Sequence, residues 1–191
     1  MFRTYHRRRR EQKTDYAKRL SMLRSGKTRL VVRRSLTGMK IQFIDYEPAG
    51  DKTKITVTTA DLKKFGWKSY TGNIPSSYLI GLIAGLRAKS VGIEEAILDV
   101  GLQTSTKASR IYAALKGVID SGVNVNHSEK IFPDESRISG DHIVKYAQSL
   151  DDDKKKKLFS KYYSAGVNPE DLSKHFSDAK QKIIDAKGVN K

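Results

Sequence analysis

Between residues 29 and 59 the chain contains three short β-like runs that mix apolar and polar positions and are rich in β-branched residues. Turns that contain glycine or proline separate these runs, an arrangement typical of antiparallel strands. The pattern predicts a three-stranded meander, with strands at residues 29–35, 40–46 and 54–59. A short helical segment at residues 60–65 is expected to follow the third strand.

From residue 76 to residue 91 the pattern changes to a long, almost continuously apolar helix. Pro75 suits the first turn of this helix, where a missing N–H costs nothing. One side of the helix carries only small residues, namely Gly81, Ala84, Gly85 and Ala88. We predict that this side lies close against the sheet, in preference to the membrane-type packing that small residues also permit.

Two further elements complete the predicted core. Residues 95–100 form a short apolar run, typical of a buried strand. Residues 107–121 form an amphipathic helix whose inward positions are Ile111, Ala114, Leu115, Val118 and Ile119. The order of three strands, helix, strand and helix predicts an α/β fold with a mixed sheet that is covered by helices.

The regions that flank this core are expected to be helical. On the N-terminal side, Thr14 or Asp15 can cap a short helix with an apolar stripe of Tyr16, Leu20 and Leu23. On the C-terminal side, residues 127–133 are expected to hold one short extended segment, after which helical patterns prevail. The sequence thus predicts three regions: a basic arm with a short helix at residues 1–26, an α/β core at 27–139 and a helical appendage at 140–191.

Positive charge is concentrated at the N-terminus. Residues 1–40 contain 14 Lys or Arg against two acids, and so carry +12 of the chain's formal net charge of +16. Phe2, Tyr5, His6 and Tyr16 are set among these cations. Such an arm repels itself and cannot bury itself, so it needs a polyanion to order it. Nucleic acid is the first candidate, and a nuclear-import signal, nonspecific binding or a basic chromatin protein are the alternatives.

The composition excludes several kinds of site. The absence of cysteine rules out disulfides, iron–sulfur clusters and zinc sites with cysteine ligands, and the four histidines lack ligand-like spacing. We therefore expect no metal and no cofactor. No segment offers the roughly 18 to 20 uncharged apolar residues that cross a bilayer, and no secretory signal follows the basic start. We expect a cytosolic protein with no membrane and no small-molecule substrate as partner.

Patterns for catalysis are weak. The tripeptide Gly26-Lys27-Thr28 resembles the last three residues of a phosphate-binding loop. However, Ser21 occupies the position where the Walker pattern needs glycine, and a predicted strand follows the tripeptide instead of a helix. Asp45 and Asp99 each end a predicted strand and could supply two carboxylates of a metal-dependent nuclease. An RNA-processing nuclease is therefore the alternative function, whereas the leading prediction assigns no catalytic residue.

Two loops carry groups that suit phosphate. Lys107 and Arg110 fall in the first turn of the second predicted helix, after three hydroxyl residues, so that cations and free backbone N–H groups meet at one helix N-terminus. Residues 68–73 offer Lys68, Thr71, Gly72 and Asn73 at the entrance of the first long helix. The alternative for this second loop is a plain helix cap with a turn glycine.

Three segments together resemble a known family. They are RRREQKTDYAKR at residues 8–19, GWKSYTGNIP at 66–75 and LDVGLQTSTKASR at 98–110, and residues 113–122 and 127–135 extend the likeness. Their order and spacing resemble the large-subunit ribosomal proteins that bind 5S ribosomal RNA, numbered eighteen in bacterial naming and five in eukaryotic naming. The acidic segment 133–135, the C-terminal helices and the length are similar to an archaeal-type member.

The resemblance implies a three-layer core and a structural, non-enzymatic role in the large ribosomal subunit, where the protein would anchor 5S rRNA in the central protuberance. The implied partners are 5S rRNA, 23S-type rRNA, a second 5S-binding ribosomal protein and other central-protuberance proteins. Together with the two loops, it points to these RNA-binding residues: Arg3, Tyr5, Arg7, Arg8, Arg9, Arg10, Lys13, Tyr16, Arg19, Lys68, Thr71, Gly72, Asn73, Thr106, Lys107 and Arg110. Residues 151–191 match the family least, and their role stays open.

Overall fold

The computed structural model describes residues 4–186 of the chain, which has a five-stranded sheet at its centre. In spatial order the strands are β3 (Lys52–Thr58), β2 (Met39–Asp45), β1 (Thr28–Arg34), β4 (Glu95–Asp99) and β5 (Asn124–Val125). The pairs β3–β2 and β2–β1 are antiparallel, whereas β1–β4 and β4–β5 are parallel. The predicted α/β fold with a mixed sheet is confirmed.

The last strand lies earlier than the sequence pattern indicates. An extended segment is expected within residues 127–133, but the strand is β5, and Glu129–Ile131 forms a turn of 3-10 helix, η2. The N–H of Asn124 donates to the carbonyl of Glu94 at 2.8 Å, so the chain joins the sheet almost as soon as it leaves the preceding helix. The prediction was wrong because a two-residue strand has no periodicity of its own.

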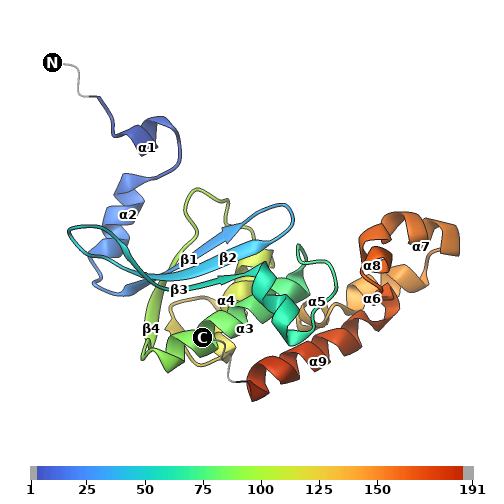
Figure 1. The fold of residues 1–191 in the computed structure, drawn as a ribbon. Helices are drawn as coiled ribbons and strands as arrows, with labels where there is room; N and C mark the ends of the chain where they lie inside the picture. Colours follow the sequence, from blue (N-terminus) through green and yellow to red (C-terminus); the bar gives the residue numbers. More distant parts are fainter. Residues whose placement is uncertain (1–3, 187–191) are drawn as a thin grey trace.

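One face of the sheet forms the hydrophobic core. The side chains of Leu30, Val32, Ile41, Phe43 and Val57 alternate with more exposed ones and are completely buried. Helices α3 (Ile74–Ser90) and α4 (Arg110–Asp120) contact this sheet, and α5 (Glu135–Ser139) and α9 (Leu172–Asp185) contact α3 in turn. Figure 1 shows this succession from the sheet through α3 and α4 to α9.

The two glycines on the small side of α3 pack against α4, where the sequence predicted the sheet, and this corrects the prediction. A Cβ atom on Gly81 would overlap the backbone carbonyl of Ala114, and one on Gly117 would overlap the carbonyl of Tyr78. The two backbones therefore approach closely at these glycines, as small residues allow. Within residues 4–186, no helix combines the length and the apolar character that a membrane crossing requires.

The C-terminal region consists of α6 (Asp141–Gln148), α7 (Asp152–Leu158), α8 (Ser160–Ser164), the 3-10 turn η3 (Pro169–Asp171) and α9. Buried side chains of α9, such as Leu172 and Ile183, belong to the same hydrophobic cluster as the sheet residues. The Ser173 hydroxyl donates to the Asp141 carboxylate at 2.6 Å and so joins α9 to α6. The independence of residues 140–191 as a separate appendage stays a prediction.

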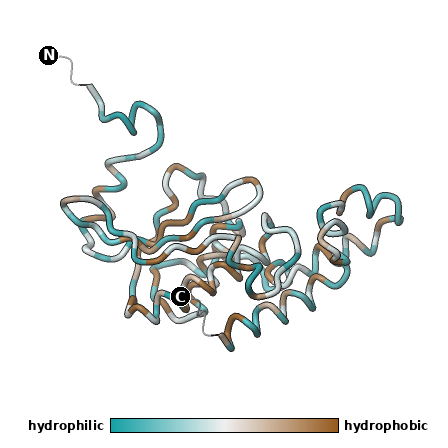
Figure 2. The backbone as a smooth tube through the Cα atoms, viewed as in Figure 1, coloured by the Kyte–Doolittle hydropathy of each residue, from teal (hydrophilic) through white to brown (hydrophobic). Residues whose placement is uncertain are grey.

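The N-terminal arm contains α1 (Arg7–Arg10) and α2 (Tyr16–Leu23) and extends away from the sheet (Figure 1). Figure 2 shows it as a hydrophilic segment beside the apolar strands. Asp15 caps α2, since its carboxylate accepts hydrogen bonds from two backbone N–H groups, and this cap was predicted. The predicted stripe is only partly right: Leu20 is 54% exposed, and the buried apolar residue of α2 is Met22. The 3-10 helix η1 (Thr59–Phe65) follows β3, as predicted.

Candidate nucleic-acid interface

The arm presents consecutive arginines to solvent. Arg7–Arg10 make up α1, and all four side chains are exposed. The guanidinium carbon of Arg9 lies 4.2 Å from the centroid of the Tyr5 ring, and the rings of His6 and Tyr16 lie 5.1 Å apart. Stacking of this kind uses the face of a guanidinium and leaves its N–H edge able to bind phosphate. Arg3, another predicted RNA-binding residue, lies outside the described residues.

Local contacts take up only part of the arm's charge. Glu11 lies 3.7 Å from the Nε atom of Arg7 and 2.9 Å from the Nζ atom of Lys13. The Nε atom of Arg8 donates to the hydroxyl of Thr14 at 2.9 Å. Exposed ion pairs like these typically contribute about 0.2 to 1 kcal/mol. They therefore offer little resistance to a phosphate that competes for the same cations.

A chain of ion pairs attaches the arm to the sheet. Arg19 of α2 donates to both carboxylate oxygens of Asp51 at 2.9 Å, and Asp51 also accepts from Arg29 of β1 at 2.5 Å. Arg29 in turn donates to Asp99 of β4 at 3.2 Å, and Arg33 donates to the other oxygen of Asp99 at 3.0 Å. Arg29 and Asp99 are buried, so this network fixes where α2 meets the sheet. An RNA contact by Arg19 stays a prediction.

The two carboxylates of the nuclease alternative do not converge. Asp45 accepts from the Thr28 hydroxyl and pairs with Lys54, both at 2.6 Å, whereas Asp99 holds the two arginines described above and lies beside Val31. Burial raises the pKa of the Asp45 carboxyl, but the hydrogen bonds from Lys54 and Thr28 outweigh this effect and hold the pKa below its ordinary value. Residues 4–186 contain no group of three metal-type side chains. Each aspartate therefore has a structural ion pair, and the geometry gives no support to a nuclease.

Three loops meet at the end of the sheet that lies away from α2. We call them the loop cluster, and they comprise residues 35–38, 68–73 and 101–110. Arg110 joins all three, because its guanidinium donates to the carbonyl of Gly72 at 3.0 Å and to the carbonyl of Ser35 at 3.1 Å. The structure thus brings together the two predicted phosphate-binding loops and adds the β1–β2 turn, which the sequence did not indicate.

Two side-chain hydroxyl groups form further hydrogen bonds between these loops. Tyr70 donates to the carbonyl of Leu36 at 3.1 Å, and Thr71 donates to the carbonyl of Thr37 at 2.6 Å. Lys68, at the start of the second loop, is exposed. The loop cluster therefore carries cations and is held together by hydrogen bonds between its own loops.

Helix α4 begins later than predicted. Arg110 is its first residue and Ser109 its N-cap, so Lys107 and Thr106 lie in the preceding loop, where both are exposed. Ala108 has a φ of 55°, in the left-handed region that costs a residue with a Cβ roughly 1 to 2 kcal/mol. Its N–H donates to the carbonyl of Ile131 at 2.9 Å, which holds this conformation. The backbone at Lys107 is therefore fixed by its neighbours.

Asn73 has a structural role that the sequence raised as an alternative. Its side-chain oxygen accepts from the N–H of Ser76 at 3.0 Å and so caps α3. Its side-chain nitrogen donates to the Tyr162 hydroxyl at 3.1 Å, which ties the loop cluster to α8. The cap is confirmed, and an RNA contact by Asn73 stays a prediction.

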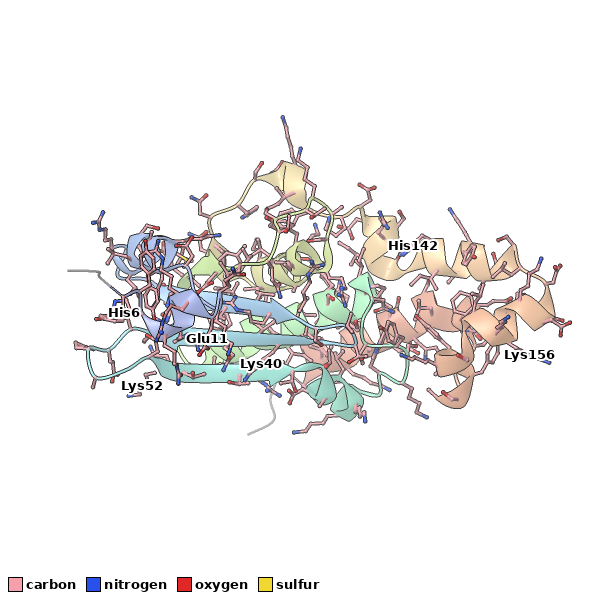
Figure 3. All side chains as sticks on the ribbon, turned by 90° about the horizontal axis from the view of Figure 1, so that it is seen from above. His6, Glu11, Lys40, Lys52, His142 and Lys156 are labelled. Carbon is pink, nitrogen blue, oxygen red and sulfur yellow. The ribbon has the colours of Figure 1, made fainter. Side chains whose placement is uncertain are left out.

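The arm and the loop cluster lie at the two ends of β1, roughly 20 Å apart for a strand of seven residues. Between them runs the sheet face that points away from the core, on which Arg33 and Lys40 are direct neighbours across β1 and β2. Figure 3 views the sheet from above, with His6 and Glu11 of the arm near one end and Lys40 further along. These two sheet cations were not predicted as RNA-binding residues. The sequence could have revealed them through the period of two along a strand, because Arg33 and Lys40 alternate with the buried positions of β1 and β2.

Comparisons with known proteins find ribosomal proteins. The family described as ribosomal large subunit proteins 60S L5 and 50S L18 matches residues 1–94 and 89–128. The large ribosomal subunit protein uL18 of Methanothermobacter thermautotrophicus is 47% identical over 177 residues, which cover 93% of this chain and 92% of that protein.

Proposed function

The chain belongs to the family of ribosomal large subunit proteins 60S L5 and 50S L18, and we propose that it binds 5S ribosomal RNA and anchors it in the central protuberance. Membership makes it a structural component of the large ribosomal subunit and not an enzyme. Ribosomal RNA and other ribosomal proteins are therefore its partners. Contacts with 23S-type RNA and with a second 5S-binding protein are part of the proposal.

The observation that supports 5S binding is the placement of two cationic surfaces at opposite ends of β1. Four exposed arginines of α1 lie beyond one end, and the loop cluster with Lys107 lies at the other. Arginine pairs with two phosphate oxygens at once, and neighbouring aromatic rings can stack on bases. A folded RNA can therefore contact both surfaces and the sheet face between them.

The two surfaces differ in how much of their shape exists before RNA binds. The loop cluster is braced by Arg110, Tyr70 and Thr71, whereas α1 has no buried residue. Phosphates that lie between the arginines relieve the electrostatic repulsion among them. We infer that the loop cluster docks as a preformed surface and that the arm takes its final conformation against RNA.

The direct test compares the affinity of the purified chain for 5S rRNA, for a transfer RNA of similar size and for duplex DNA of equal length. We expect the chain to bind 5S rRNA more tightly than the other two nucleic acids. We also expect Lys107→Ala to bind 5S rRNA more weakly than the full chain, although the stability of the folded protein is unchanged. Equal binding to all three nucleic acids would indicate a nonspecific basic protein and would contradict the proposal. Footprints on 5S rRNA are then compared for the full chain and for Lys107→Ala. Nucleotides that are protected by the full chain but not by the variant would identify the RNA segment that the loop cluster contacts.

A further inference from the structure

The loop cluster and the C-terminal helices border a groove that the proposed function does not use. Its volume is about 560 Å³, and four of its lining residues are aromatic: Tyr70, Tyr146, Phe159 and Tyr162. We call it the aromatic groove. Asn73 and His142 are its polar members, and no acidic residue lines it. The volume lies in the range of about 300 to 1,000 Å³ that is usual for sites that bind small molecules or parts of larger ones.

The floor of the aromatic groove is preformed. Phe159 and Tyr162 are 9% and 6% exposed, and their rings meet edge to face with centroids 5.5 Å apart. The hydrogen bond between Asn73 and the Tyr162 hydroxyl holds this floor to the N-terminus of α3. A ligand would therefore meet fixed ring surfaces and would not have to order them.

The rim, in contrast, is exposed and apolar. Tyr146 of α6 is 53% exposed and Leu158 of α7 is 59% exposed, although both border the groove. Large apolar side chains that flank an apolar groove in this way are typical of a surface that a partner covers. Figure 1 shows the helices that carry them, α6 to α8, clustered on one side of the molecule.

Two polar side chains, Lys161 and His142, lie beside the rings of the groove. The Nζ atom of Lys161 is 5.1 Å from the centroid of the Tyr70 ring, so a cation stands at the border between the groove and the loop cluster. His142 also lines the groove, and its ring forms a hydrogen bond with the backbone of Ser136. Burial lowers the pKa of His142, and the neutral ring can donate or accept one hydrogen bond at pH 7.

We propose that the aromatic groove holds an unstacked base of a single-stranded RNA segment that continues from the loop cluster. The inference rests on the proposed function, because it takes RNA at the loop cluster as its starting point. Tyr70 and Asn73 belong to both surfaces, so an RNA strand that crosses residues 68–73 passes the groove. The base stacks on the rings, and Lys161 faces the phosphate beside it.

Charge favours RNA over a protein segment as the occupant. Lys156 and Lys157 are exposed directly before Leu158, and Lys161 follows on α8 (Figure 3 labels Lys156). A groove without a carboxylate offers no partner to a basic peptide, whereas the phosphates of an RNA strand match these lysines. An apolar peptide is the competing occupant.

The test uses a single-stranded RNA octamer with one 2-aminopurine base, whose fluorescence falls when the base stacks on an aromatic ring. The full chain is compared with Tyr146→Ala, with Tyr146→Phe, which keeps the ring, and with Tyr163→Ala. Tyr163 is a matched control, because it is 41% exposed on α8 but does not line the groove. We expect quenching with the full chain, Tyr146→Phe and Tyr163→Ala, and about tenfold weaker binding with Tyr146→Ala at an unchanged melting temperature.

Binding of 5S rRNA is measured on the same samples to separate this inference from the proposed function. If the full chain binds 5S rRNA but does not quench the octamer, or if Tyr146→Ala and Tyr163→Ala bind the octamer equally, the groove does not hold a base. Binding of a leucine-rich peptide that Tyr146→Ala abolishes, without octamer quenching, would likewise overturn the inference and assign the groove to a protein. Failure of the full chain to bind 5S rRNA would contradict the proposed function instead.

Discussion

At the scale of single residues, two cations three positions apart have different roles. Arg110 donates to the carbonyls of Gly72 and Ser35, whereas Lys107 is exposed in the loop before α4. Lysine cannot bridge two carbonyls with a planar fork. We expect Arg110→Lys to lower the free energy of unfolding by about 1 to 2 kcal/mol and also to weaken RNA binding.

Lys107→Ala is the matched control, because it removes a cation from the same surface without removing a structural hydrogen bond. Urea unfolding of both variants, together with 5S rRNA titrations, separates the two roles. If Arg110→Lys unfolds at the same urea concentration as the full chain, the loop cluster does not need the bridge that Arg110 makes.

His142 makes stability depend on pH. Burial lowers its pKa in the folded chain below the ordinary value of about 6.5. Below about pH 6.5, His142 binds a proton in the unfolded chain but not yet in the folded chain. The free energy of unfolding therefore falls as the pH falls from about 7 toward the pKa of His142 in the folded chain. We expect the urea midpoint to drop less between pH 7.5 and pH 5.5 in His142→Gln than in the full chain. Equal drops in both proteins would show that His142 does not contribute.

Residue roles were predictable from the sequence only in part. The pattern identified Asn73, Lys107 and Arg110 as polar groups near helix entrances, and Asp15 as a cap, because capping depends on neighbours in the chain. The carbonyl partners of Arg110 lie 38 and 75 positions away and depend on the tertiary fold. No local pattern could have named them.

At the scale of helices and strands, the sequence pattern predicted more of the structure than it did for the roles of single residues. Strands β1 to β4 and helix α3 were found within about two residues, because each is a run rich in apolar or β-branched residues with glycine or proline near its boundaries. The partner of the small side of α3 was wrong, since Gly81 and Gly85 indicate that a neighbour is close but not which neighbour it is. The apolar stripe of α2 was misplaced because the helix buries Met22 and also pairs Arg19 with Asp51, neither of which belongs to the predicted stripe.

The α3–α4 contact gives a stability prediction. Replacing Gly81 by Ala puts a methyl group into the carbonyl of Ala114, which is rigid helix backbone. We expect Gly81→Ala to lower the free energy of unfolding by about 1 to 3 kcal/mol, as overpacking usually does. Ser90→Ala is the control on the same helix, where the residue is exposed and the change should be nearly neutral. Thermal unfolding of the two variants tests the contact, and equal melting temperatures would contradict it.

At the scale of the whole molecule, positive charge is densest in the part of the chain that packs least. The arm, residues 1–26, contains nine Lys or Arg against two acids and so carries +7 of the net charge of +16, which leaves +9 for the remaining 165 residues. The hydrophobic cluster includes the sheet, α3, α4 and α9, but no residue of α1. The core thus folds around its own apolar side chains, and we expect the arm to supply a large share of the attraction to RNA.

The most direct test of this account is the salt dependence of 5S rRNA binding by the full chain and by a chain that lacks residues 1–13. This deletion removes six Lys or Arg residues, so the slope of log affinity against log salt should flatten by roughly 3 to 5, using about 0.9 per neutralised phosphate from duplex DNA as a guide. The account predicts weaker binding and a flatter slope at a nearly unchanged melting temperature. A large drop in melting temperature with intact 5S rRNA binding would contradict it.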